Sequence, residues 1–216
     1  YWNGLNDTGY PINVSLALPD GFVAEPIGWP APERQVSPGE ILDHVYYERV
    51  TLLVPLRVPN EALPGGEVVI RGKVDWLACR TACVPGKADL ELRLQVVQSA
   101  GTPGTPGDPE AAALFAEARK RLPVAWEEAE GAIRWSWRDR FLVLEAPGAR
   151  SLAFYPLAEC AALDSPLRDG ASEADTLRLA LAGEAGPTDP VAGVLAITRD
   201  EKRIDYYSLS LPQPER

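Results

Sequence analysis

Two segments near residues 67–78 and 88–97 alternate between apolar and polar side chains, most cleanly over residues 70–76 and 88–96. A period of two is typical of a β-strand that buries one face. The apolar positions, which we expect to point inward, are Ile70, Gly72, Val74 and Trp76 in the first segment and Leu90, Leu92, Leu94 and Val96 in the second. The polar positions, which we expect to face outward, are Arg71, Lys73, Asp75, Asp89, Glu91, Arg93 and Gln95. The pattern predicts an antiparallel hairpin.

The connection of this hairpin holds two cysteines in the sequence Cys79-Arg-Thr-Ala-Cys83. Continuing the alternation places both on the polar face. If they lie opposite each other across a tight loop, their Cα atoms come within about 5.5 Å, close enough for a disulfide. A disulfide that closes so short a loop restricts the unfolded chain much less than a long-range bridge does. The pattern therefore favours a reactive pair over a structural one, and an ordinary hairpin disulfide stays open as an alternative.

The charges near the cysteines also favour reactivity. Arg80 and Lys87 supply positive charge, which favours thiolate formation in an accessible pair. A metal site is a further alternative, because a C-x3-C on a β-sandwich also occurs in binuclear copper sites. The histidine and methionine expected there are replaced by Lys87 and Leu90, and the chain has one histidine, His44, and no methionine. A copper-binding module that uses the cysteine pair with His44 stays open, and zinc would need Cys160 as well.

Outside the hairpin, most of the chain consists of short apolar segments between Gly, Pro and Asp turn signals. We expect further strands near residues 10–18, 49–58, 132–138, 140–146, 151–155, 175–181, 191–198 and 203–210. Because helices do not alternate with these strands, the sequence argues against a parallel α/β sheet. It predicts an all-β protein made of two tandem β-sandwich domains.

The clearest domain boundary is the sequence QSAGTPGTPGDPE at residues 98–110, with three prolines and three glycines. Asp108 is a candidate N-cap and Pro109 a candidate first residue for one helix, PEAAALFAEARKRL, which Pro123 ends. The predicted organisation is a first domain at 1–98, a linker at 99–109 and a second β-rich domain at 110–216. Cys160, in the second domain, is expected to be a buried small apolar residue.

Charge and composition limit the partners. The formal net charge of -10 argues against nucleic acid and against an anionic membrane surface. No apolar run approaches the roughly 20 residues that cross a bilayer. Because the chain of 216 residues begins at Tyr1 and contains no methionine, we expect it to be a processed or trimmed piece of a longer protein. The sequence also contains no Gly-rich phosphate loop and no nucleophile elbow, so no cofactor is expected.

Three stretches resemble a known family. VDWLACRTACVPGKADLELRL is similar to the signature of the periplasmic N-terminal domain of DsbD-like thiol:disulfide interchange proteins, including their ScsB-type members. The family's N-terminal segment is similar to the stretch YWNGLNDTGYPINVSLALPDGFVAEPIGWPAPER of this chain. A later part of the family is similar to HVYYERVTLLVPLRV. The resemblance covers about residues 1–97. Residues 110–216 resemble, more loosely, the second extracytoplasmic domain of the ScsB-type members.

The resemblance implies that the first domain is immunoglobulin-like and is a thiol-disulfide oxidoreductase with Cys79 and Cys83 as its catalytic pair. In the family, a membrane-embedded domain and a thioredoxin-like domain of the parent protein relay electrons to this domain. It then reduces disulfide-containing proteins of the periplasm. We therefore expect a periplasmic electron-transfer domain of an inner-membrane protein, of a kind linked to cytochrome c biogenesis.

The chain departs from the best-known family members in its cysteine spacing and in the loop that caps their cysteines. The corresponding segment here, SPGEILDHVYYE at residues 37–48, is expected to be a mobile lid over the hairpin. Its candidate cap or tuning residues are Asp43, His44, Tyr46, Tyr47 and Glu48. The two tyrosines have rings large enough to cover the sulfurs, and His44 is expected to be a surface loop residue.

Overall fold

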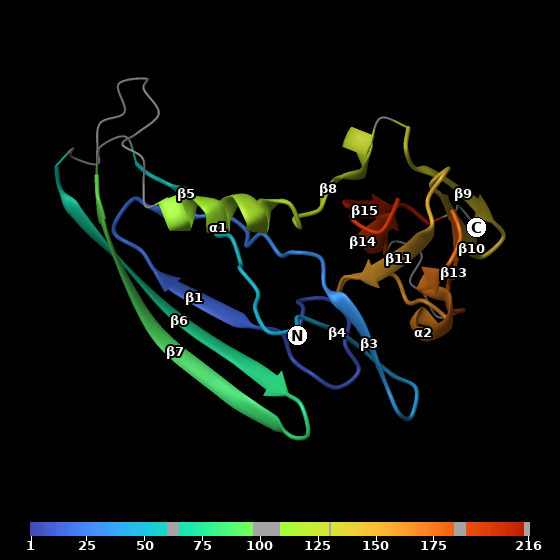
Figure 1. Cartoon of the computed structure of the whole chain (residues 1–216), viewed down its shortest axis with the longest axis horizontal. Coiled ribbons are helices and arrows are strands. Elements are labelled where there is room, and N and C mark those ends of the chain that lie inside the picture. The colour runs from blue at the N-terminus through green and yellow to red at the C-terminus, as the bar shows by residue number, and fades with distance from the viewer. Residues whose placement is uncertain (60–64, 97–108, 130, 184–188, 214–216) are drawn as a thin grey trace.

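The computed structural model describes residues 1–59, 65–96, 109–129, 131–183 and 189–213, which form an all-β molecule with two halves side by side (Figure 1). The predicted all-β fold is confirmed. The N-terminus lies near the centre of the view, next to β4. Within the described ranges, no helix combines the length and the apolar character needed to cross a bilayer.

The first half contains three small antiparallel sheets. Its strands are β1 (Asn13–Ala17), β2 (Val23–Ala24), β3 (Glu33–Ser37), β4 (Ile41–Val45), β5 (Leu56–Arg57), β6 (Glu67–Cys79) and β7 (Cys83–Gln95). The sheets have the orders β1-β6-β7, β2-β5 and β3-β4. The long hairpin of β6 and β7 extends away from the rest of the molecule, with β7 along its outer edge (Figure 1).

The second half is a β-sandwich. Its elements are α1 (Pro109–Arg119), β8 (Val124–Ala125), a 3-10 turn (Trp126–Ala129), β9 (Arg134–Arg138), β10 (Phe141–Glu145), β11 (Ser151–Pro156), α2 (Pro166–Asp169), β12 (Ala171–Ser172), β13 (Thr176–Ala180), β14 (Val191–Thr198) and β15 (Ile204–Leu211). A sheet β13-β10-β9 packs on a sheet β12-β11-β14-β15-β8. Leu142, Phe154, Leu179 and Leu195 are almost fully buried between them. Burial of such side chains is the main favourable term in folding.

Nine of the ten predicted strands are confirmed with small shifts of their ends, and the hairpin β6–β7 accounts for two of these. The expected strand at 49–58 is wrong for most of its length: this segment forms only β5 and an isolated bridge between Gly28 and Leu53. The helix after the linker is confirmed as α1. Residues 99–108 of the predicted linker lie outside the described residues, so the domain limits stay a prediction.

The residues of β6 and β7 share faces as the alternation predicts. The burial of β7 differs from the prediction. Ile70 lies opposite Leu92, and Gly72 lies opposite Leu90. Ile70, in the central strand, is 6% exposed, whereas Leu90 and Leu92 are 57% and 54% exposed. The expectation that the β7 leucines point into a core is therefore wrong. A periodic pattern identifies a common face, and burial also requires a second layer over that face.

The N-terminal segment joins the two halves. Trp2 is 1% exposed, and its ring meets His44 of β4 and Tyr155 of β11 edge to face, at centroid distances of 5.8 and 6.3 Å. The Leu5 N–H donates to the Pro156 carbonyl oxygen at 2.9 Å. The packing of Trp2 on this sheet explains why β14 is apolar at nearly every position. One face of β14 covers the sandwich core, and Val194 on its other face packs in the same cluster as Trp2.

His44 lies inside this junction, so the expectation of a surface loop residue is wrong. The side chain is 0% exposed, and its ring lies 5.5 Å from that of Tyr155. Nδ1 is 2.6 Å from the Leu5 carbonyl oxygen. Burial lowers the pKa of His44, and the nearby Arg34 lowers it further, against the opposing effects of the Leu5 hydrogen bond and of Asp43 and Asp7.

This burial predicts a loss of stability in mild acid. The unfolded chain takes up a proton on His44 near pH 6.5, whereas the folded protein resists it, so the unfolded state binds more protons below that pH. The free energy of unfolding in urea should therefore fall between pH 7.5 and 5.5, by at most about 1.4 kcal/mol per pH unit. A His44→Phe variant keeps an aromatic ring and should lose this dependence. Equal stability of the native protein at both pH values would contradict the assignment.

Candidate functional site

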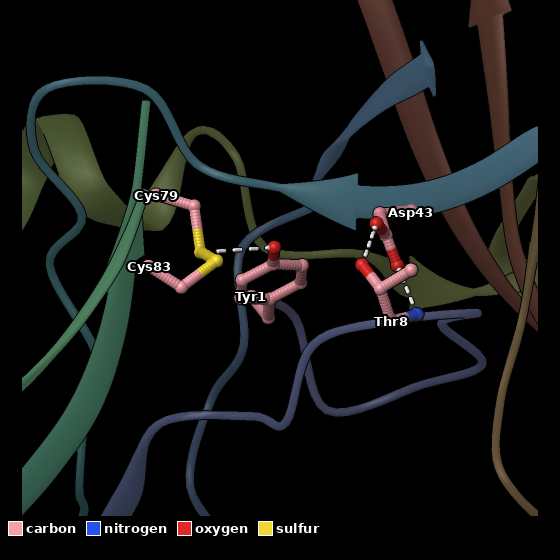
Figure 2. Close-up of a disulfide and its surroundings, with 5 residues drawn as sticks. All are labelled: Tyr1, Thr8, Asp43, Cys79 and Cys83. Atoms are coloured by element: carbon pink, nitrogen blue, oxygen red, sulfur yellow. Dashed lines mark hydrogen bonds between the residues drawn. A yellow bond between two sulfur atoms is a disulfide. The ribbon is translucent and has the colours of Figure 1, made fainter. Parts of the chain in front are cut away.

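The two cysteines close the free end of the β6–β7 hairpin as a disulfide (Figure 2). Cys79 and Cys83 are the last pair of the strand register, with a Cα–Cα distance of 4.1 Å. Both residues are exposed, and the Arg80 N–H donates to the Ala82 carbonyl oxygen at 3.3 Å across the turn. The disulfide is on the polar face, as the alternation predicts, since Cys79 has the same parity as Asp75. A partner thiol therefore has access to the sulfurs.

Cross-strand pairs of opposite charge hold the polar face of the hairpin in register. The pairs that lie directly opposite each other are Arg71 and Glu91, Lys73 and Asp89, and Asp75 and Lys87. Of these, the Arg71 guanidinium contacts the Glu91 carboxylate at 3.1 Å. Each exposed pair of this kind is worth about 0.2–1 kcal/mol, so their sum is a modest term. Their common effect is to fix the register that brings the two cysteines opposite each other.

The apolar face contributes a close contact between Trp76 and Gly86, which lie opposite each other next to the Leu77–Pro85 pair, on its side away from the turn. A Cβ atom on Gly86 would lie only 2.3 Å from Cε2 of Trp76. Only glycine therefore lets the indole ring lie flat across the neighbouring strand at this distance. The ring covers the hairpin near its reactive end and packs the two strands together below the disulfide.

Tyr1 contacts the disulfide directly, and the sequence analysis did not identify this residue. Its hydroxyl donates to Sγ of Cys79 at 3.2 Å (Figure 2). The ring lies against Gly9, where a Cβ atom would come within 2.1 Å of it. The only sequence signal was the Tyr-Trp-Asn opening of the family-like segment, because the two contacting residues are 78 positions apart. A hydrogen bond of this kind stabilises negative charge on the sulfur after the disulfide opens.

The acidic residue of the expected cap anchors the N-terminal segment. Asp43 is 5% exposed and accepts hydrogen bonds from the Thr8 N–H at 2.9 Å and the Thr8 hydroxyl at 2.5 Å (Figure 2). Residues 37–48 are not a loop throughout, because Ile41–Val45 form strand β4. Asp43 and its neighbour His44 therefore support the segment that carries Tyr1, and act on the disulfide only through it.

The remaining cap candidates have other partners. The Tyr46 hydroxyl donates to the Pro30 carbonyl oxygen at 2.7 Å, and burial raises the pKa of Tyr46. The exposed Tyr47 hydroxyl bonds to the Gln35 side chain. Glu48 is exposed, with a positive φ of 58°. A covering role of Tyr46 and Tyr47 stays a prediction, whereas the hydrogen bond to the disulfide comes from Tyr1.

Cys160 lies in the second half and packs against the sandwich core. Burial raises the pKa of its thiol to about 11, so little thiolate forms at neutral pH. This packing agrees with the prediction that Cys160 acts as a small apolar residue. Within the described part of the chain, no group of three or more His, Cys, Asp and Glu side chains is placed to hold a metal ion.

Residues 1–95 match the family model of thiol:disulfide interchange protein DsbD, N-terminal. The resemblance is confirmed. No curated protein and no solved structure matches the chain significantly. The DsbD N-terminal match and the exposed disulfide together support thiol:disulfide interchange as the activity of the first half.

The Tyr1 contact predicts a change in thiol reactivity. In a Cys83→Ala background, Tyr1→Phe keeps the ring but removes the donor, so less thiolate forms on Cys79. Its alkylation by iodoacetamide at pH 7, followed by mass spectrometry, should slow by about three- to tenfold, because a hydrogen bond to a charged group contributes on the order of 1 kcal/mol at an exposed site.

The matched control for this experiment is Tyr47→Phe, which removes the hydroxyl of another exposed tyrosine in the expected cap. It should leave the rate unchanged. A change in Tyr47→Phe with none in Tyr1→Phe would contradict the assignment and favour the cap at residues 37–48.

Proposed function

We propose that residues 1–95 are a dithiol/disulfide carrier in the periplasm. The domain passes two electrons from membrane-embedded and thioredoxin-like domains of a parent protein to disulfide-containing periplasmic proteins. The observation that carries this proposal is the exposed Cys79–Cys83 disulfide at the free end of a hairpin, in a domain that matches the DsbD N-terminal family. A pair at the end of a hairpin can enter the active site of a second protein without any rearrangement of the fold.

The carrier is reduced by a partner dithiol. A partner thiolate attacks one sulfur of the Cys79–Cys83 disulfide in line with the S–S bond, which forms a mixed disulfide and releases the other cysteine as a thiolate. The second thiol of the partner then attacks the partner's sulfur in the mixed disulfide. The partner leaves oxidised, with a new disulfide of its own, and the carrier holds two reduced cysteines and the two electrons.

Delivery to a substrate runs through the same chemistry in the opposite direction. A carrier thiolate attacks the substrate disulfide, and one substrate sulfur leaves as a thiolate that takes up a proton. The second carrier cysteine attacks its neighbour's sulfur, closes the Cys79–Cys83 disulfide and releases the second substrate thiol. The substrate gains two electrons and two protons, and the carrier returns to the state of Figure 2.

Tyr1 supports an order for these steps. Its hydroxyl donates to Sγ of Cys79, so negative charge is better stabilised on Cys79 than on Cys83. Cys79 is therefore the better leaving thiolate when the carrier is reduced through Cys83. It is also the better nucleophile of the reduced pair, which makes Cys83 the residue that resolves the mixed disulfide with substrate.

The copper alternative gains no support from the position of its third ligand. His44 is fully buried, and its Nδ1 is engaged with the Leu5 carbonyl oxygen. The cysteines are exposed at the hairpin end, so a site that joins the three side chains would require the junction around Trp2 to open.

The order of attack predicts which variant traps a partner. The Cys83→Ala variant keeps the proposed nucleophile and lacks the resolving cysteine, so it should accumulate mixed disulfides with a thioredoxin-like partner or a disulfide-containing substrate on non-reducing gels. Cys79→Ala should accumulate fewer, and Cys160→Ala, the control, should behave as the native protein. Trapping that depends on Cys160, or no trapping by either single variant, would contradict the carrier proposal.

A further inference from the structure

Strand β7 is the edge of its sheet and carries an exposed apolar row. The sheet order is β1-β6-β7, so in the described part of the chain β7 has a strand on one side only. Leu90, Leu92 and Leu94 are 57%, 54% and 42% exposed and share one face. In Figure 1, the strand runs along the outer edge of the molecule. A long edge strand with an apolar face is open to pairing with another strand.

The register with β6 identifies the backbone groups that are free for such pairing. The Val96 N–H donates to the Gly66 carbonyl oxygen at 2.8 Å, so the even-numbered residue points its backbone groups toward β6. Backbone direction alternates along an antiparallel strand. The N–H and C=O groups of the odd-numbered residues therefore point away from the sheet. These residues are Asp89, Glu91, Arg93 and Gln95.

We propose that two copies of this chain associate through β7, paired antiparallel about a two-fold axis at Leu92. In this register no like charges lie opposite each other. Glu91 lies opposite Arg93 of the second copy, and Arg93 lies opposite its Glu91. Leu92 meets Leu92 at the axis, and Leu90 meets Leu94 on the same face. The free backbone groups of the odd-numbered residues form the inter-chain hydrogen bonds.

Charge complementarity selects this register over its neighbours. An axis at Leu90 would place Asp89 against Glu91 and Lys87 against Arg93, which are like charges, and an axis at Leu94 would place Arg93 against the neutral Gln95. An axis at Glu91 or Arg93 would place that residue against itself. Like charges directly opposite each other destabilise a strand pair, whereas opposite charges stabilise it. Within one chain, Arg93 contacts Glu91 at 2.6 Å. When the axis lies at Leu92, this pair and the same pair of the second copy form one network of four charges.

The same geometry ends the pairing before the disulfide and leaves the carrier function free. Pro85 is an odd-numbered residue without an N–H, so it cannot extend the inter-chain ladder toward the hairpin end. Cys83 lies nine residues from the axis, or about 30 Å along the strand. The two disulfides then lie at opposite ends of the paired hairpins, and both stay exposed. Association is therefore independent of the proposed exchange activity.

The test is the oligomeric state of the full chain by sedimentation velocity from low micromolar to near-millimolar concentration. The native protein should show a monomer–dimer equilibrium. Leu92→Lys places two cations at the axis and should raise the dimer dissociation constant about tenfold or more. The matched control is Val84→Lys, because Val84 is an exposed apolar residue of the same strand, 62% exposed, outside the paired register. It should leave the dissociation constant unchanged.

Charge reversal tests the register itself. Glu91→Arg and Arg93→Glu should each weaken self-association, because each sets like charges against each other in both halves of the pair. An equimolar mixture of the two variants should form a heterodimer, since every pair is then complementary. This recovery also shows that both variants are folded.

Three results would overturn the proposal. The first is a native protein that stays monomeric at every concentration, as expected if the edge binds a segment of another protein. The second is an equal effect of Leu92→Lys and Val84→Lys on the dissociation constant. The third is a mixture of the two charge-reversal variants that fails to associate. Leu92→Lys should leave thiol exchange intact, so failure of the dimer and failure of the carrier function are separate outcomes.

Discussion

The anchoring of the N-terminal segment on strand β4 is the interaction on which the rest of the arrangement depends. The Trp2 N–H donates to the His44 carbonyl oxygen at 2.8 Å, and Asp43 holds Thr8 a few residues later. The N-terminal segment is therefore anchored on β4 at two points, Trp2 and Thr8. At its start, Tyr1 reaches the disulfide of one sheet, while Trp2 packs on the sandwich of the other half. One buried contact thus positions the reactive end of the hairpin relative to the second half.

The hairpin separates stability from reactivity. Its register is set by charge pairs and by Trp76 over Gly86, all of which lie before the disulfide. A bridge that closes a loop of five residues stabilises a fold by about 2 kcal/mol in the chain-entropy account, against about 4.7 for a loop of 100 residues. Opening the Cys79–Cys83 bond therefore costs the fold less than half of what opening a long-range bridge would cost. An exposed bond that the fold does not need is suited to repeated reduction and oxidation.

The sequence predicted those features that depend on local pattern. Alternation identified β6, β7, their shared faces and the position of the cysteines, since each follows from a period of two. Burial of Leu90 and its neighbours was predicted wrongly, because it depends on a second layer that no local pattern encodes. Residues 37–48 were interpreted as a lid, although Gly39 and Glu40, with φ of 92° and 61°, form the tight turn of the hairpin β3–β4 there. The Tyr1 contact was missed because it depends on tertiary packing across 78 positions.

The proposed carrier function requires the disulfide to react in the folded protein. The most direct measurement is the rate at which dithiothreitol reduces the Cys79–Cys83 bond as urea increases, below the unfolding transition. If the exposed bond reacts in place, the rate should be nearly independent of urea throughout that range, because no opening step precedes attack. A rate that rises with urea in parallel with the unfolded fraction would mean that the disulfide reacts only after the fold opens, which would contradict the claim.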